Sequence, residues 1–96
     1  MTRDDILRIL RDHRDDLTRL GVKSLALFGS AARDEATRRS DVDLLVEFSR
    51  PVGLFEFIDV KDYLERLLGC RVDLVTRDAL KPQLQQTILQ EAVHAL

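Results

Sequence analysis

Two short patterns in this 96-residue chain are of the kind that does phosphate chemistry. A Gly29-Ser30 pair follows an apolar run, and Asp41-Val42-Asp43 begins after ten further residues. Glycine allows a tight turn, and free backbone N–H groups at the start of a helix bind phosphate. Two carboxylates separated by one residue suit a hard divalent cation. The spacing therefore predicts a phosphate site beside a metal site.

The acidic residues are expected to gather on neighbouring strands. Asp41 and Asp43 should project together from one strand, because side chains two residues apart lie on the same face, and Val42 should point into the core. Asp73 lies in a later apolar run that could pair beside that strand. Carboxylates this close repel one another unless a cation lies between them. Three of them could hold two Mg²⁺ ions about 3.5–4 Å apart, which would activate an attacking oxygen and stabilise a leaving phosphate.

The segment after Gly29 predicts the phosphate side of this site. A short helix is expected over residues 30–33, with free N–H groups and the positive end of its dipole at Ser30. The Ser30 hydroxyl can add a hydrogen bond, and Arg33, one turn further on, can reach an oxyanion. Phosphoryl and nucleotidyl transfers depend mainly on such positioning and charge neutralisation.

Each pattern alone has a simpler explanation. A Gly-Ser pair is more often a turn with a helix N-cap, and an Asp-x-Asp pair is most often two solvated surface carboxylates. Asp73 alone could be a strand-edge charge that discourages aggregation. The combination favours a site, because Asp43 and Asp73 each stand directly before Leu in an apolar run.

The surrounding pattern predicts an α/β fold, a small mixed β-sheet with flanking helices. Apolar residues at three- and four-residue spacing indicate helices, and short apolar runs bounded by glycine or proline indicate strands. The run ending at Phe28 is apolar on both faces, as in a central strand. Phe55 and Phe57 are expected in the core. The predicted helices span residues 2–20, 30–33, 54–68 and 82–96, and the predicted strands span 22–28, 41–48 and 71–76.

Length and composition narrow the function classes. Residues 1–96 are expected to form a single domain. The formal net charge of −2 argues against direct nucleic-acid binding. Cys70 is the only cysteine, so no internal disulfide is expected. The charged N-terminus predicts no signal peptide, and no apolar run is long enough to span a membrane, so a cytoplasmic location is expected.

The run from Leu27 to Phe48, together with residues 71–76, resembles the minimal nucleotidyltransferases, the MNT proteins of the DNA polymerase beta-like superfamily. Their signature is Gly-Ser, a spacer, Asp-x-Asp and a later Asp on a strand. Members usually have glycine after the Ala-Arg pair, where this chain has Asp34. The signature matches this chain at Gly29, Ser30, Asp41, Asp43 and Asp73.

The resemblance implies Mg²⁺-dependent transfer of a nucleoside monophosphate, AMP from ATP, to a hydroxyl acceptor. It implies that Gly29 and Ser30 bind the phosphates and that Asp41 and Asp43 ligate metal. Asp73 would also ligate metal and help deprotonate the acceptor. Attack on the α-phosphate would release pyrophosphate.

The resemblance also implies a protein partner, a HEPN-domain ribonuclease toxin that the MNT protein neutralises, in some cases by adding AMP to a toxin tyrosine. Larger superfamily members hold the base and the acceptor with another domain, so a partner or a second copy of the chain is expected to complete the site. The alternative is a binding module that masks a toxin by contact, with an idle acidic triad.

Overall fold

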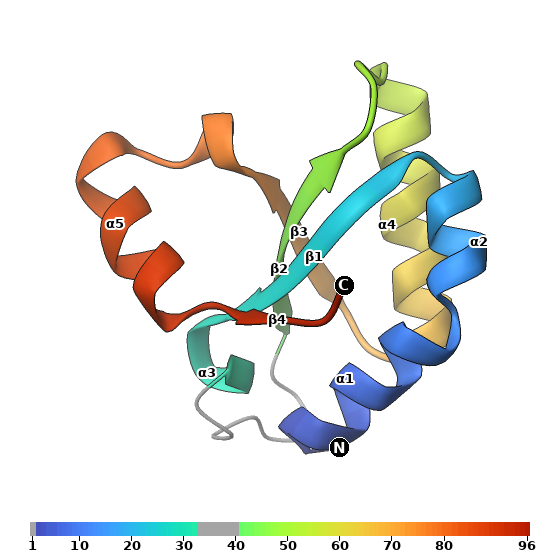
Figure 1. Cartoon of the computed structure of the whole chain (residues 1–96), viewed down its shortest axis with the longest axis horizontal. Helices are drawn as coiled ribbons and strands as arrows, with labels where there is room; N and C mark the ends of the chain where they lie inside the picture. Colours follow the sequence, from blue (N-terminus) through green and yellow to red (C-terminus); the bar gives the residue numbers. More distant parts are fainter. Residues whose placement is uncertain (1, 33–40) are drawn as a thin grey trace.

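The computed structural model describes residues 2–32 and 41–96, and there a mixed sheet runs in the order β3-β2-β1-β4. β1 (Val22–Phe28) pairs antiparallel with β2 (Val42–Phe48) and with β4 (Val93–His94), whereas β2 pairs parallel with β3 (Val72–Thr76). Figure 1 shows α1, α2 and α4 together on one side of the sheet and α5 on the other. The predicted mixed sheet with flanking helices is confirmed.

The core lies between the sheet and the helices α1 (Arg3–Asp12), α2 (Arg14–Arg19) and α4 (Leu54–Leu68). The burial pattern of β2 reflects this arrangement. Every second residue is buried against these helices, and the residues between them, on the opposite face, are not buried. Asp43 is therefore on the face turned away from these three helices. The largest fully buried side chains are Ile6, Leu10, Leu17, Leu25, Leu27, Leu44, Val46, Val60 and Leu64.

The first predicted helix is broken at His13, where a continuous helix over residues 2–20 was expected. The His13 ring nitrogen Nδ1 lies 2.8 Å from the carbonyl oxygen of Ile9, the acceptor that the His13 amide would use in a helix. The amide bonds instead to the Leu10 oxygen at 3.2 Å. When a side chain binds the carbonyl oxygen that the amide of the same residue would use in a helix, the helix tends to end at that residue. α1 begins with a capping box, in which the Asp5 amide donates to the Thr2 hydroxyl and the Thr2 amide donates to the Asp5 carboxylate.

The last predicted helix is too long, because α5 (Pro82–Glu91) ends five residues before the C-terminal Leu96. After it the chain turns into β4 beside β1, and the Ala95 amide donates to the Leu25 oxygen at 2.9 Å. Ala95 is only 3% exposed. Strand pairing and burial of Ala95 thus override the helical periodicity, and periodicity carries no information about a distant partner strand.

Arg11 holds this C-terminal segment in place. Its Nε donates to the Ala95 oxygen and its Nη2 to the His94 oxygen, both at 3.2 Å. Arg11→Ala should lower the free energy of unfolding by about 1–2 kcal/mol, because hydrogen bonds from a charged donor are lost. Hydrogen exchange should also show faster exchange at β4. Arg8→Ala is the control, because Arg8 makes an exposed ion pair with Asp5, worth about 0.5 kcal/mol. Equal protection of β4 in all three proteins would contradict the role of Arg11.

The start of α4 differs from expectation in its burial. Phe55 is 82% exposed and Leu54 is 70% exposed, so the prediction that Phe55 belongs to the core is wrong. Phe57 does pack inward, with its ring centroid 6.3 Å from that of Phe48. A residue two places away on a helix points about 200° around the axis, which explains the contrast. None of the helices in residues 2–32 and 41–96 is long and apolar enough to cross a membrane.

Candidate active site

Two of the predicted carboxylates meet where β2 and β3 begin. The strands are parallel and in register, so that Asp43 stands directly beside Asp73, and Val42 beside Val72. β2 begins at Val42 rather than at the expected Asp41, which precedes the strand. Asp43 is half-buried, whereas Asp41 and Asp73 are exposed. The cluster therefore has an inner carboxylate and two that solvent and ligands can reach.

The three carboxylates act on one another electrostatically. Burial raises the pKa of the Asp43 carboxyl above its ordinary value of 3.8. The negative charges of Asp73 and Asp41 raise this pKa further, as does a hydrogen bond with Asp73. The site thus concentrates negative charge, and a cation bound there would favour the ionised form of Asp43 again.

Gly29 makes room for the inner carboxylate. It has a left-handed backbone with φ of 69°, and a β-carbon there would overlap Oδ2 of Asp43. We expected Gly29 to let the backbone approach a phosphate. In the structure, the group that lies against Gly29 is the Asp43 carboxylate. Gly29 also begins α3 (Gly29–Ala32), whose last carbonyl accepts a hydrogen bond from Arg3 Nη1 at 3.4 Å. The turn after β1 is therefore built around Asp43.

Two predicted phosphate ligands are not tested by this geometry. Ser30 lies in α3, but its side chain is outside the described part of the structure. Arg33 lies outside the described residues altogether, as does Asp34. Their roles in phosphate binding stay predictions.

The donor chemistry of the cluster fits Mg²⁺ only if other ligands contribute. Within residues 2–32 and 41–96, no three His, Cys, Asp or Glu side chains form a group that could hold a metal ion by themselves. Mg²⁺ in proteins usually takes one or two carboxylates and fills its octahedron with water and substrate phosphates. The adjacent Asp43 and Asp73, with Asp41 beside them, supply carboxylates of that kind. The residues therefore suit a cation shared with a phosphate ligand.

Comparison with known proteins agrees with this geometry. The sequence profile described as the nucleotidyltransferase domain matches residues 7–94, which include Gly29 and all three carboxylates. The chain belongs to the nucleotidyltransferase domain family. It is 44% identical to the protein adenylyltransferase MntA of Thermococcus cleftensis, over 98% of this chain and 96% of that protein.

Solved structures confirm the fold of this nucleotidyltransferase. The structure of a minimal nucleotidyltransferase superposes with a TM-score of 0.82 at 39% identity, covering 97% of this chain and 95% of the other. A more distant match is the complex of a tri-AMPylated Shewanella oneidensis HEPN toxin with its MNT antitoxin. It has a TM-score of 0.60 at 20% identity, covering 98% of this chain and 68% of that one, and it shows likeness of fold alone.

A groove of about 480 Å³ opens beside the carboxylates of the nucleotidyltransferase. Asp41 and Asp73 line it together with Lys61 and Glu65 of α4, and with Arg71 and Val72 at the start of β3. Lys61 and Arg71 were not predicted as site residues. For Arg71 a signal existed, because it stands two positions before Asp73 and so shares its side of an extended chain. For Lys61, on another element, sequence spacing gave none.

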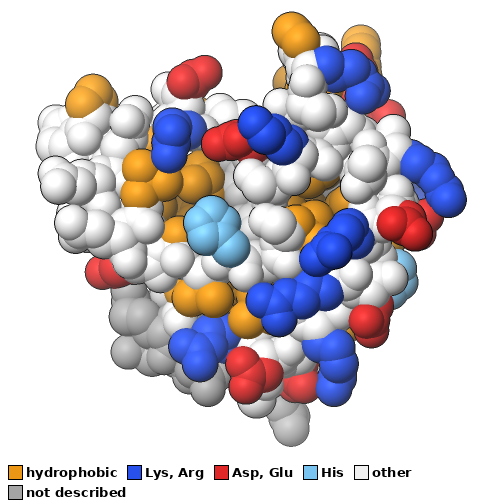
Figure 2. Space-filling view, viewed as in Figure 1, with side chains coloured by type: hydrophobic (Ala, Val, Ile, Leu, Met, Phe, Trp, Pro, Cys, Tyr) orange, Lys and Arg blue, Asp and Glu red, His pale blue; other side chains and the backbone are white. Residues whose placement is uncertain are grey.

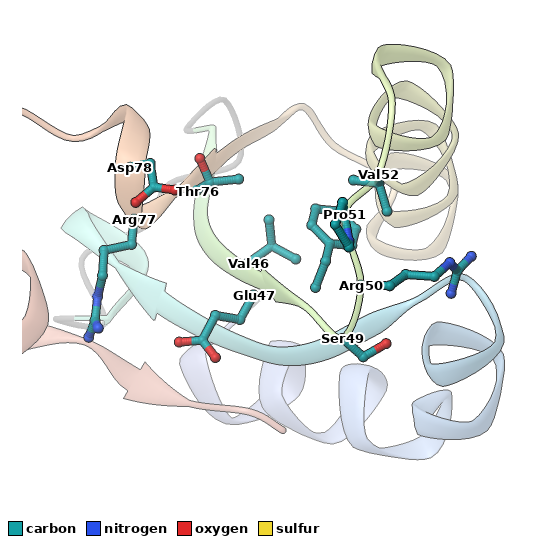
Figure 3. Close-up of a pocket in the computed structure, with 10 residues that line it drawn as sticks. Val46, Glu47, Ser49, Arg50, Pro51, Val52, Thr76, Arg77 and Asp78 are labelled. Atoms are coloured by element: carbon teal, nitrogen blue, oxygen red, sulfur yellow. The ribbon is translucent and has the colours of Figure 1, made fainter.

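The nucleotidyltransferase has a larger groove, of about 550 Å³, at the other end of β2. Val46, Ser49 and Pro51 line it together with Thr76 and Arg77 (Figure 3). Its lining has neither a pair of adjacent carboxylates nor the glycine turn. Size alone therefore does not locate the chemistry, and the carboxylate end of the sheet is the candidate active site.

The face of the sheet that carries Asp43 is only partly covered. α5 has no buried residue, and Leu84 and Leu89 on it are 49% and 36% exposed. Figure 2 shows apolar side chains at the surface between α5 and the sheet. Ala26, Leu45 and Leu89 line a narrow pocket there. This face of the nucleotidyltransferase therefore has exposed apolar side chains beside a narrow pocket.

Proposed function

We propose that this nucleotidyltransferase transfers AMP from ATP to a tyrosine hydroxyl of a partner HEPN-domain toxin and so acts as its antitoxin. The observation that carries the proposal is the register of Asp43 with Asp73, with Asp41 adjacent and the Gly29 turn packed on Asp43. The adenylyltransferase relative supports the choice of AMP, and the complex of an AMPylated HEPN toxin supports the partner.

The Gly29 turn and the three carboxylates have separate roles in the proposed reaction. The turn that begins at Gly29, with Ser30 and Arg33, binds the triphosphate. Asp41, Asp43 and Asp73 hold Mg²⁺, two ions in the full site, which when bound neutralises phosphate charge and eases deprotonation of the attacking hydroxyl. Asp73 accepts the hydroxyl proton. The hydroxyl oxygen then bonds to the α-phosphorus, the bond from that phosphorus to the bridging oxygen breaks, and pyrophosphate leaves.

A protein acceptor fits the exposure of the site. Asp41 and Asp73 are both exposed, and the groove beside them is open at the surface. A tyrosine on a folded partner can therefore reach them, and the partner then excludes the water that would otherwise compete as acceptor.

Neutralisation by contact alone is the second candidate function. The observation that favours it is the exposure of Leu54, Phe55 and Ile58 at the start of α4, because an exposed apolar patch often marks a protein interface. Under this alternative the carboxylates are not needed for neutralisation.

One experiment separates the two functions. The chain is incubated with ATP labelled at the α-phosphate, Mg²⁺ and the candidate HEPN-domain partner, and toxin activity is measured in parallel. We expect label on the partner and loss of toxin activity, both abolished by chelating the metal or by Asp41→Ala/Asp43→Ala. Full neutralisation by the double variant would instead support contact alone, and label transfer by it would contradict the assigned site.

A further inference from the structure

Two cationic side chains beside the carboxylates have no counter-ion among the described residues. Lys61 is half-buried on α4, and Arg71 is exposed just before β3; both line the groove that contains Asp41 and Asp73. In the described part of the chain, neither side chain makes a hydrogen bond or an ion pair. By contrast, Arg50 is paired with Glu56 at 3.4 Å. A bound anion would supply the partner that this cation pair lacks among the described residues.

Glu65, the acidic residue of the groove that shares α4 with Lys61, is already engaged. Glu65 stands one helical turn after Lys61, and its Oε2 accepts a hydrogen bond from the Val72 amide at 3.0 Å. This contact ties α4 to the first residue of β3. It leaves the Lys61 ammonium group available to a ligand in the groove.

The position of the pair in the sheet indicates which ligand it meets. β2, which carries Asp43, lies between β1, which leads into the Gly29 turn, and β3, which carries Asp73. In an in-line displacement the attacking and leaving oxygens lie on opposite sides of the phosphorus. If pyrophosphate leaves on the Gly29 side, the acceptor arrives on the β3 side, where Lys61 and Arg71 stand. This step rests on the proposed function.

We propose that Lys61 and Arg71 bind an anionic group that the acceptor carries beside its reacting hydroxyl, and thereby select the acceptor. The anion is a carboxylate or a phosphate. The Arg71 guanidinium can bind either one through two parallel hydrogen bonds, and the Lys61 ammonium group adds a point charge. The two residues are specificity determinants of the acceptor and do not hold the nucleotide.

The test is peptide binding in the presence of Mg²⁺, which offsets the charge of the neighbouring carboxylates, in the absence of nucleotide and at low salt, where exposed charge pairs are least screened. Fluorescein-labelled tyrosine peptides flanked by glutamate, by phosphoserine or by glutamine are titrated with the full chain, and anisotropy is measured. We expect the wild type to bind one of the anionic peptides about five- to tenfold more tightly than the glutamine peptide. Whether glutamate or phosphoserine is preferred identifies the source of the anion.

The variants decide whether the preference comes from this pair. Lys61→Gln/Arg71→Gln should lose it, whereas the control Arg66→Gln/Lys81→Gln, which removes two exposed charges outside the groove, should keep it. The affinity for AMP-PNP should be unchanged in both. A wild type without preference, a groove variant that retains it, or a matching loss of AMP-PNP affinity would overturn the inference. Because this binding requires no transfer, a failure of AMP transfer would count against the proposed function only.

Discussion

Asp43→Asn should reduce AMP transfer by about 10²- to 10³-fold or more, the loss typical of removing one key electrostatic group from an active site. Asparagine keeps the size of the side chain but lacks the negative charge that a cation needs. The same substitution should make the metal-free protein more stable. Activity and stability are therefore expected to change in opposite directions, which is the signature of a strained functional residue.

The stability gain has a defined pH dependence. Burial, with the charges of Asp73 and Asp41, raises the pKa of Asp43 in the folded protein above 3.8. As the pH rises past 3.8, the unfolded chain releases its Asp43 proton first, so the free energy of unfolding falls until the folded pKa is passed. Above that pH the loss is constant. The asparagine side chain of the variant cannot lose a proton, so its advantage should be absent at about pH 3 and present at about pH 7.

Thermal unfolding in a metal chelator measures this effect. We expect Asp43→Asn to unfold at a higher temperature than the wild type near neutral pH. The gain should be at most about 1 kcal/mol, because solvent screens the half-buried carboxylate. Asp62→Asn, at an exposed position of α4, is the matched control and should change little. Added Mg²⁺ should stabilise the wild type more than Asp43→Asn, because a ligand stabilises the state that binds it. Equal stability of the variant and the wild type at both pH values would show that Asp43 is not strained.

Gly29→Ala should destabilise the protein by about 2–4 kcal/mol and abolish AMP transfer. A left-handed backbone costs a residue with a β-carbon about 1–2 kcal/mol, and overlap with a packed neighbour costs about as much again. The overlapped neighbour is Oδ2 of Asp43, so the substitution should also displace the inner carboxylate.

Gly69→Ala separates the two contributions. Gly69 ends α4 with the same φ of 69°, but a β-carbon there meets nothing within 4 Å. The Gly69→Ala variant should therefore lose only the part of the free energy of unfolding that comes from the left-handed backbone, about 1–2 kcal/mol, and should keep full activity. Unfolding in urea and the label-transfer assay measure both quantities. If Gly29→Ala behaved like Gly69→Ala in both, the contact between the glycine turn and Asp43 would have no functional importance.

Much of the fold could be predicted because its signals are local. β1 is bounded by Gly21 and Gly29, and α4 ends at Gly69, where each glycine has a positive φ. The predictions from the sequence were wrong where a distant or competing contact determines the local structure. The His13 ring takes the Ile9 oxygen and breaks the first helix, and β4 forms only because the edge of β1 is there to receive it.

The candidate site also has parts that could be predicted from the sequence and parts that could not. That Asp43 and Asp73 lie on neighbouring strands could be predicted, because each stands directly before Leu in an apolar run. Their register in a parallel pair comes from the structure. Lys61 could not be predicted, because its approach to the carboxylates depends on how α4 packs along β3. The contact of Gly29 with Asp43 depends on the exact course of two strands, and no spacing in the sequence encodes it.

AMP transfer to the partner is measured most directly by the intact mass of the partner protein after coexpression with this chain. We expect a partner heavier by one or more AMP units, attached to a tyrosine, and an unmodified partner when the chain carries Asp41→Asn/Asp43→Asn. The carboxylate cluster would then be the site of transfer. A partner that is neutralised but unmodified by the wild-type chain, or that is still modified by the double variant, would contradict it.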